Sequence, residues 1–201
     1  MRLKVCGLTN AENAREVAML GVDAIGLVFY EKSPRNVSIT TAQEIIKNLP
    51  PFINKVGLFV NAKQSFIDKV INNVAIDTLQ FHGDETPKEC EKYALPFIKA
   101  VRVDETINLY QISKNFNKAC GLLLDAKHDT LYGGSGQSFD WSLIKEKIEI
   151  PIILAGGLNE NNVKQAIAKV KPYGVDVSSG VEQSKGIKDI QQVKNFMEQI
   201  R

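Results

Sequence analysis

Apolar and polar positions alternate in blocks along the whole chain. Short runs rich in Val, Ile, Leu and Phe are each followed by a stretch whose apolar residues recur with helical period. The runs predict eight strands, at residues 3–8, 24–30, 54–60, 78–83, 96–103, 121–126, 151–157 and 174–180. The stretches between them predict eight helices, at about 10–20, 40–49, 63–74, 86–94, 108–116, 141–148, 159–170 and 188–200. Candidate N-caps are Asn10, Thr40, Thr86 and Asn159.

This order of elements predicts a parallel sheet. Strands that are apolar along nearly their whole length are typical of parallel sheets, and a helix after each strand supplies the crossover connection. The predicted strands begin about 24 residues apart, which leaves little chain for a second domain. We therefore expect an α/β fold, a (β/α)8 TIM barrel formed by residues 1–201 as one catalytic domain. An open doubly wound sheet is the main alternative, because alternation alone does not distinguish the two.

Composition narrows the classes of function. The chain has 201 residues, of which 44% are hydrophobic, and its 25 basic and 23 acidic residues give a net charge of +2 without a block of either sign. No nucleic-acid-binding face is indicated, whereas a small anionic ligand is compatible with this charge. The sequence has no apolar run near the ~18 residues of a membrane span and no signal-peptide core at its start.

The three cysteines are widely spaced and contain no CxxC pair. This spacing disfavours a disulfide framework and a structural zinc site, and it favours a reducing compartment. We therefore expect a cytoplasmic protein that does not bind membranes.

Polar residues occur at the carboxyl ends of several predicted strands. The packing of a buried strand does not require polar side chains at these positions. They are Cys6, His82, Asp125, Asp176, Ser178 and Ser179, together with the Gly156–Gly157 pair. The carboxyl ends of the strands carry the active site in (β/α)8 barrels, so we expect these residues to meet at the barrel mouth. Because side chains alternate along a strand, Lys4 shares a face with Cys6, Gln80 with His82, and Asp176 with Ser178.

Two glycine-containing segments follow the last two predicted strands. They are AGGLNENNV at 155–163 and VDVSSGVEQSKG at 175–186. Glycines ahead of a helix let backbone N–H groups approach an anion at the positive end of the helix dipole. Loops after the seventh and eighth strands are the usual phosphate site of this barrel. The alternative, equally compatible with either loop taken singly, is that the glycines serve only a tight turn. The predicted phosphate-binding residues are Gly156, Gly157, Ser178, Ser179 and Gly180.

A third segment, LYGGSGQSFDW at 131–141, matches neither a dinucleotide fingerprint nor a P-loop, and we interpret it as a mobile lid. The two histidines, His82 and His128, do not have the spacing of metal ligands. The sequence therefore predicts neither a cofactor nor a metal.

Eight motifs in order along the chain resemble one family, the phosphoribosylanthranilate isomerases of tryptophan biosynthesis. They are KVCGLTN at 4–10, GVDAIGLVFYEKSPRNV at 21–37, VGLFVN at 56–61, LQFHGDE at 79–85, LLLDA at 122–126, LYGGSGQSFDW at 131–141, ILAGGLNENNV at 153–163 and GVDVSSGVEQSKGIKD at 174–189. The resemblance implies a (β/α)8 barrel that isomerises N-(5-phosphoribosyl)anthranilate to 1-(o-carboxyphenylamino)-1-deoxyribulose 5-phosphate. This Amadori rearrangement needs no cofactor and is the third step from chorismate to L-tryptophan.

The resemblance also implies roles for individual residues. Cys6 corresponds to the general base and Asp125 to the general acid, while Arg35 corresponds to the arginine near the anthranilate carboxylate. Asp176 and His82 are expected to contact the substrate. The phosphate contacts fall on Gly156, Gly157, Ser178 and Ser179.

The reaction requires a suitable protonation state of both Asp125 and Cys6. Burial would raise the pKa of Asp125, as a general acid at neutral pH needs. A thiol with a pKa near ~8.5 is mostly protonated at pH 7, so Cys6 would benefit from a nearby cation, for which Lys4 is the candidate.

Each residue also has a structural interpretation that its position alone allows. Cys6 would be a packing residue, Asp125 a turn or helix cap, His82 a hydrogen-bonded core residue and Arg35 a solvated charge.

Two other functions stay open at this stage. The related sugar isomerisation of histidine biosynthesis would predict aspartate in place of Cys6 and two phosphate sites. A non-catalytic barrel that binds sugar phosphates would not need Cys6 and Asp125. A closed barrel has no open sheet edge, so a monomer is favoured over a homodimer.

Overall fold

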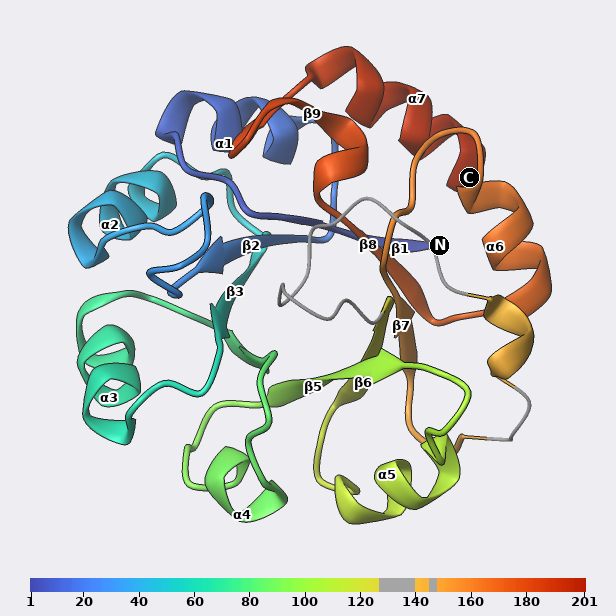
Figure 1. Ribbon diagram of the computed structural model, residues 1–201. Coiled ribbons are helices and arrows are strands. Elements are labelled where there is room, and N and C mark those ends of the chain that lie inside the picture. The colour runs from blue at the N-terminus through green and yellow to red at the C-terminus, as the bar shows by residue number, and fades with distance from the viewer. Residues whose placement is uncertain (127–139, 145–147) are drawn as a thin grey trace.

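The computed structural model describes residues 1–126, 140–144 and 148–201, and in these ranges a closed parallel barrel is formed (Figure 1). Its strands pair in chain order from β1 to β8, and β8 pairs with β1 to close the sheet. The closure confirms the predicted (β/α)8 barrel and excludes an open sheet. The strands are β1 (Arg2–Cys6), β2 (Ala24–Val28), β3 (Asn54–Phe59), β4 (Thr78–Phe81), β5 (Phe97–Val103), β6 (Gly121–Ala126), β7 (Ile152–Leu154) and β8 (Gly174–Val177).

The helices surround the strands as an outer ring (Figure 1). They are α1 (Ala11–Met19), α2 (Ile39–Lys47), α3 (Gln64–Asn73), α4 (Pro87–Cys90), α5 (Leu109–Asn115), α6 (Val163–Val170) and α7 (Ile190–Ile200), with 3-10 turns η1 (Trp141–Leu143) and η2 (Ser179–Val181). None of the described helices has the length and apolar character needed to cross a bilayer. The predicted helix at 141–148 is wrong where it is described, because residues 141–143 form a single 3-10 turn. The predicted lid falls almost entirely within 127–139, outside the described residues.

Helix starts show where sequence signals compete. Asn10 and Thr86 are confirmed as N-caps of α1 and α4. Thr40 is not a cap, because the Ser38 hydroxyl accepts the hydrogen bond from Thr41 N at 3.0 Å and the helix begins between them. Ser38 has the extended backbone typical of an N-cap, and it is therefore the cap in place of Thr40.

Asn159 also does not cap a helix. Its carbonyl accepts hydrogen bonds from the backbone N–H groups of Asn162 and Val163, so residues 159–162 form a turn. The helix α6 begins at Val163, with Asn162 as its N-cap. The loop between β7 and α6 is consequently longer than the sequence pattern predicts.

The barrel separates two packing regions. Leu3 and Val5 face the large apolar core between the sheet and the helices, whereas Lys4 and Cys6 face the barrel interior. The interior holds a smaller apolar cluster, formed by Ile98, Ala100, Leu123 and Ala155. Polar side chains that face inward are therefore buried and need partners inside the barrel.

A short antiparallel hairpin follows β8 and was not predicted. It consists of β9 (Glu182–Ser184) and β10 (Ile187–Lys188), and its sequence EQSKG lacks the apolar alternation of a strand. Gly186 in its turn accepts hydrogen bonds from Thr9 N at 3.2 Å and Thr9 Oγ1 at 3.0 Å. The hairpin therefore lies against the loop that leads from β1 to α1.

Candidate active site

A pocket opens at the carboxyl ends of the strands, where (β/α)8 barrels carry their active sites. It brings together the predicted site residues apart from Gly180, which follows Ser179 in η2 and is not part of the lining. The lining consists of Cys6, Val28, Tyr30, Ser33, Arg35, Leu58, Val60, His82, Asp125, Ala155, Gly156, Gly157, Leu158, Asp176, Ser178 and Ser179.

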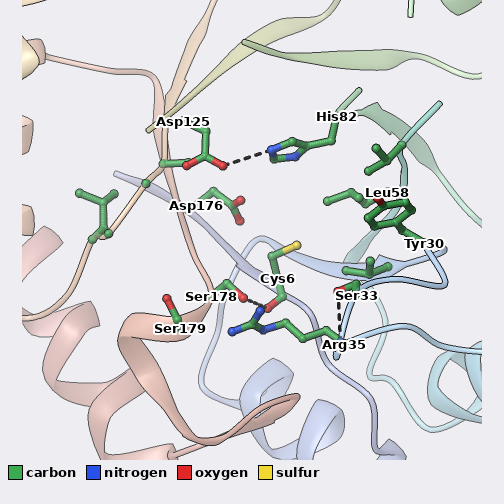
Figure 2. Close-up of a pocket in the computed structure, with 16 residues that line it drawn as sticks. Cys6, Tyr30, Ser33, Arg35, Leu58, His82, Asp125, Asp176, Ser178 and Ser179 are labelled. Atoms are coloured by element: carbon green, nitrogen blue, oxygen red, sulfur yellow. Dashed lines mark hydrogen bonds and ion pairs between the residues drawn. The ribbon is translucent and has the colours of Figure 1, made fainter. Parts of the chain in front are cut away.

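The pocket has an apolar side and a polar side. Val28, Leu58 and Val60 pack in one cluster with Cys6, and Tyr30 packs against that cluster. Figure 2 shows the Cys6 thiol and the carboxylates of Asp125 and Asp176 directed into the same space. In the same view, Ser178 and Ser179 lie across the pocket from Tyr30 and Leu58. A ligand with an aromatic part and an anionic part would match this division.

Asp125 ends the apolar strand β6 and is buried, with 6% of its surface exposed. Its Oδ1 accepts a hydrogen bond from Ala126 N at 2.8 Å, and its Oδ2 lies 3.1 Å from His82 Nε2 (Figure 2). Both contacts are hydrogen bonds of the kind that carboxylate oxygens accept. Asp125 also faces the pocket, so it is placed to transfer a proton to a bound molecule.

The imidazole of His82 is held from both sides. Gln80 Nε2 donates to His82 Nδ1 at 3.0 Å, which makes Nδ1 the acceptor. In the neutral ring the proton then lies on Nε2 and is directed at Asp125. Gln80 is fully buried, and its Oε1 has no hydrogen-bond partner in the described part of the chain.

Cys6 ends β1 in a buried position next to a cation. Burial raises the pKa of the Cys6 thiol, and the neighbouring Lys4 ammonium opposes this increase. Lys4 donates to Asp176 Oδ1 at 2.9 Å across the pairing of β1 with β8. Burial works against the Lys4 charge, but Asp176 and Cys6 outweigh it, so the pKa of Lys4 is raised and it stays an ammonium. Lys4, which the sequence offered as one candidate cation without fixing its distance, lies close enough to lower the pKa of Cys6 against the effect of burial.

Gly26 makes room for the thiol. It pairs with Cys6 across β1 and β2, and a Cβ atom at this position would lie 2.6 Å from Cys6 Sγ. Real Cβ atoms do not approach sulfur so closely, so any larger residue would move the thiol. The absence of a side chain at Gly26 is therefore part of how the site is built.

Arg35 is not a solvated surface charge. Only 8% of it is exposed, and its Nε and Nη2 donate to the two carboxylate oxygens of Glu182 at 2.7 and 2.6 Å. Its backbone N–H donates to Ser33 Oγ at 3.1 Å (Figure 2). The guanidinium thus reaches the pocket from a fixed position.

The predicted phosphate loops lie next to each other. Gly156 and Gly157 adopt positive φ angles of 81° and 62° between β7 and α6, a backbone conformation that favours glycine. Gly180 approaches the Leu158 carbonyl so closely that a Cβ atom there would overlap it. Ser178 Oγ donates to the Cys6 carbonyl at 3.0 Å, which ties the loop after β8 to β1. These two loops form one wall of the pocket.

Several contributors were not predicted as site residues, namely Gln80, Gly26, Glu182 and Lys188. Gln80 carried a usable signal, because it shares the inward face of its strand with His82. Glu182 and Lys188 belong to the unpredicted hairpin and act on the site from outside the pocket lining. Within residues 1–126, 140–144 and 148–201, no group of three or more His, Cys, Asp and Glu side chains is placed to hold a metal ion.

Comparisons with known proteins agree on one family. The family model for N-(5'-phosphoribosyl)anthranilate (PRA) isomerase matches residues 3–199. An N-(5'-phosphoribosyl)anthranilate isomerase from Pseudomonas savastanoi pv. phaseolicola is 52% identical over 197 residues, which cover 98% of this chain and 96% of that protein.

Solved structures agree in fold. The phosphoribosyl anthranilate isomerase of Thermotoga maritima superposes with a TM-score of 0.90 at 39% identity, covering 99% of this chain and 98% of the other. A complex of such an isomerase with reduced 1-(o-carboxyphenylamino)-1-deoxyribulose 5-phosphate gives a TM-score of 0.87 at 39% identity, covering 99% and 97%. A further structure, at 37% identity, TM-score 0.86 and coverage of 99% and 97%, shows monomers generated from the dimeric Thermotoga maritima enzyme.

Proposed function

The chain belongs to the N-(5'-phosphoribosyl)anthranilate isomerase family, and we propose that Cys6 and Asp125 carry the proton transfers of its reaction. The enzyme converts N-(5-phosphoribosyl)anthranilate to 1-(o-carboxyphenylamino)-1-deoxyribulose 5-phosphate in tryptophan biosynthesis. The observation that carries the proposal is that Cys6 and Asp125 face one pocket from β1 and β6. The rearrangement needs one acid and one base, and these side chains supply both.

Ring opening is the first proton transfer. Asp125, as the carboxylic acid, gives its proton to the ribose ring oxygen while the bond from that oxygen to C1' breaks. The nitrogen lone pair forms a C1'=N double bond, so the product is a protonated imine. The carboxylate that remains is stabilised by the N–H groups of Ala126 and His82.

Proton removal from C2' is the second transfer. The Cys6 thiolate takes this proton, the electrons of the broken C2'–H bond form a C1'=C2' double bond, and the electrons of the C1'=N double bond return to nitrogen as a lone pair. The Cys6 thiol returns its proton to C1' of the resulting enolamine, and the Asp125 carboxylate takes the proton of the 2'-hydroxyl. This yields the ketone without adding or removing any atom and restores both side chains to their starting forms. The Lys4 ammonium beside Cys6 favours the thiolate that this step requires.

The rest of the pocket suits the remaining parts of the substrate. We assign the phosphate to Gly156, Gly157, Ser178, Ser179 and Gly180, since glycine-containing loops after the last two strands offer backbone N–H groups. Arg35 is assigned to the anthranilate carboxylate, and the apolar cluster around Leu58 to the aromatic ring. His82 and Asp176 are assigned as substrate contacts through the same pocket.

A fluorescence assay tests this assignment. Purified enzyme should remove the anthranilate-type fluorescence of N-(5-phosphoribosyl)anthranilate faster than buffer does. Cys6→Ala and Asp125→Asn should each lower kcat by ~10²–10⁴-fold, the usual loss for a general base or acid. Cys120→Ala and Asp68→Asn serve as matched controls outside the pocket lining and should keep wild-type turnover. Near-normal turnover in either site variant would remove that residue from its role.

Three further assignments complete the proposal. Residues 1–201 act as one catalytic domain whose partner is the small phosphorylated substrate, with neither nucleic acid nor membrane involved. The cytoplasm is the proposed location, since all three cysteines are free thiols.

A monomer is proposed because the closed sheet has no open edge. A homodimer is the alternative, since some family members are dimeric. Light scattering of the purified protein distinguishes the two states.

A further inference from the structure

Glu182 binds the guanidinium of Arg35 from outside the pocket lining. Both oxygens of its carboxylate accept hydrogen bonds from the guanidinium, at 2.7 Å from Nε and 2.6 Å from Nη2. The side chains of Arg35 and Glu182 are only 10% and 6% exposed. Arg35 belongs to the pocket lining and Glu182 does not. The carboxylate therefore lies on the side of the arginine away from the ligand space.

The geometry of the guanidinium decides what this contact achieves. Arginine presents its N–H donors along separate edges of one plane, and each edge can bind a carboxylate with two parallel hydrogen bonds. Glu182 occupies the edge formed by Nε and Nη2. The edge formed by Nη1 and Nη2 remains for a second carboxylate. We propose that Glu182 is a positioning residue that aims this edge of Arg35 at the anthranilate carboxylate of the substrate. The inference rests on the proposed function.

Lys188 is a second basic partner of Glu182. Its fully buried Nζ donates to Glu182 Oε1 at 2.7 Å, so the carboxylate accepts hydrogen bonds from both Arg35 and Lys188. Although burial works against the charge of Glu182, its hydrogen bonds from Arg35 and the nearby Lys188 hold its pKa below the ordinary value. Glu182 is therefore ionised at neutral pH. Burial lowers the pKa of Lys188, and the neighbouring Glu182 carboxylate opposes this decrease. Arg35 is fixed in place by a carboxylate that Lys188 also contacts.

The same lysine connects the hairpin to the catalytic strand. Lys188 Nζ donates to the Ser178 carbonyl at 3.1 Å and to Ser178 Oγ at 3.3 Å, and Ser178 Oγ donates to the Cys6 carbonyl. The hairpin thus holds the carboxylate-binding arginine and the strand of the base in one hydrogen-bonded unit.

The obvious test is Glu182→Gln, which keeps the shape but places an amide N–H₂ opposite the arginine donors. We expect KM for N-(5-phosphoribosyl)anthranilate to rise by ~10- to 100-fold, since misplacing a binding group by about 1 Å has effects of this size. Free anthranilate, used as a competitive inhibitor, should show a Ki raised by a similar factor, with a smaller change in kcat. Gln183→Ala, an exposed change in the same hairpin, is the matched control and should leave KM and Ki unchanged.

A double-mutant cycle distinguishes a role of Glu182 in positioning Arg35 from a general contribution of Glu182 to protein stability. If Glu182 acts through Arg35, Glu182→Gln should raise KM much less in an Arg35→Lys background than in the wild type. Equal effects in both backgrounds, or a wild-type KM and anthranilate Ki in Glu182→Gln, would overturn the proposal. Should Glu182→Gln fail to fold, Glu182→Asp keeps the charge but is too short to retain both hydrogen bonds, and the same increase in KM is expected. Wild-type enzyme without turnover would refute the proposed function instead.

Discussion

His82 directs its Nε2 proton at Asp125 Oδ2 because Gln80, deeper in the barrel, donates to the other ring nitrogen. Gln80 and His82 lie two positions apart on β4 and the residue that follows it, so both face inward. The Gln80 amide is fully buried and does not line the pocket. It nevertheless determines which ring nitrogen of His82 donates a hydrogen bond to Asp125, the proposed acid. The hydrogen bond at the barrel mouth is thus linked to a side chain from the barrel interior.

Gln80→Met tests this dependence directly. The methionine fills similar space without an amide donor, so the imidazole proton should no longer be confined to Nε2. Nitrogen NMR of the histidines should show a single Nε2–H form of His82 in the wild type and a mixture of tautomers in the variant. We expect kcat to fall by up to ~10-fold, the effect of one lost hydrogen bond.

A wild-type spectrum with the proton on His82 Nδ1 would contradict the assignment. His128→Gln in both proteins leaves His82 as the only histidine and makes the spectrum unambiguous.

Alkylation of Cys6 reports its protonation state. Because the thiolate is the reacting form, the rate of reaction with iodoacetamide should rise with pH and reach half its maximum above the ~8.5 of an ordinary cysteine. The direction follows from burial, which raises the pKa of Cys6. Lys4→Met removes the opposing charge, so at pH 8 the variant should react more slowly, by ~10-fold. The measurement uses proteins in which Cys90 and Cys120 are replaced by alanine.

Lys55→Met is the control for the lysine change, since Lys55 pairs with Asp77 and does not line the pocket. An alkylation midpoint below that of free cysteine would mean that the cations dominate over burial. An unchanged rate in Lys4→Met would show that Lys4 does not act on the thiol.

Gly26→Ala should displace the Cys6 thiol, the proposed base, without changing its chemical identity. The new methyl group would lie 2.6 Å from Cys6 Sγ, so the thiol must move. We expect kcat to fall by ~10- to 100-fold while the protein stays folded, because small misplacements of a reacting group are costly. Gly57→Ala on β3 is the matched control, since its nearest neighbours are side-chain atoms at 3.3 Å. Equal activities of the two variants would argue against Cys6 as the base.

A negative charge on the loop after β8 should weaken binding of the phosphate. Ser179→Asp places a carboxylate at the pocket wall, where it repels a phosphate dianion. KM for the substrate and Ki for inorganic phosphate should both rise by ~10-fold or more. Ser65→Asp, on the exposed surface of α3, should change neither. If Ser179→Asp leaves both constants unchanged, the phosphate binds elsewhere.

The barrel itself could be predicted from the sequence because its strands are apolar and its helices are periodic. All eight barrel strands lie within or close to the predicted runs, since burial on both faces requires long apolar segments. Helix starts were less predictable. Ser38 and Thr40 are both good caps, and only the path of the chain decides between them.

Placement of the site residues at one mouth was predictable for a similar reason. Cys6, His82 and Asp125 interrupt apolar strands at their ends, and the topology brings those ends together. Their partners were not predictable. Glu182 and Lys188 contact Arg35 and Ser178 through three-dimensional proximity alone, and the polar hairpin that carries them has no periodic signal.

The hydrogen bond from Ser178 to the Cys6 carbonyl joins residues that are 172 positions apart. Strands β1 and β8 are also the pair whose contact closes the sheet. The proposed base, its lysine and the loop for the phosphate therefore meet at the seam between the beginning and the end of this chain. Bringing distant segments together is slow and entropically costly during folding. A nascent or partly folded chain would therefore lack a working site until the seam has formed, and recovery of turnover during refolding would mark barrel closure.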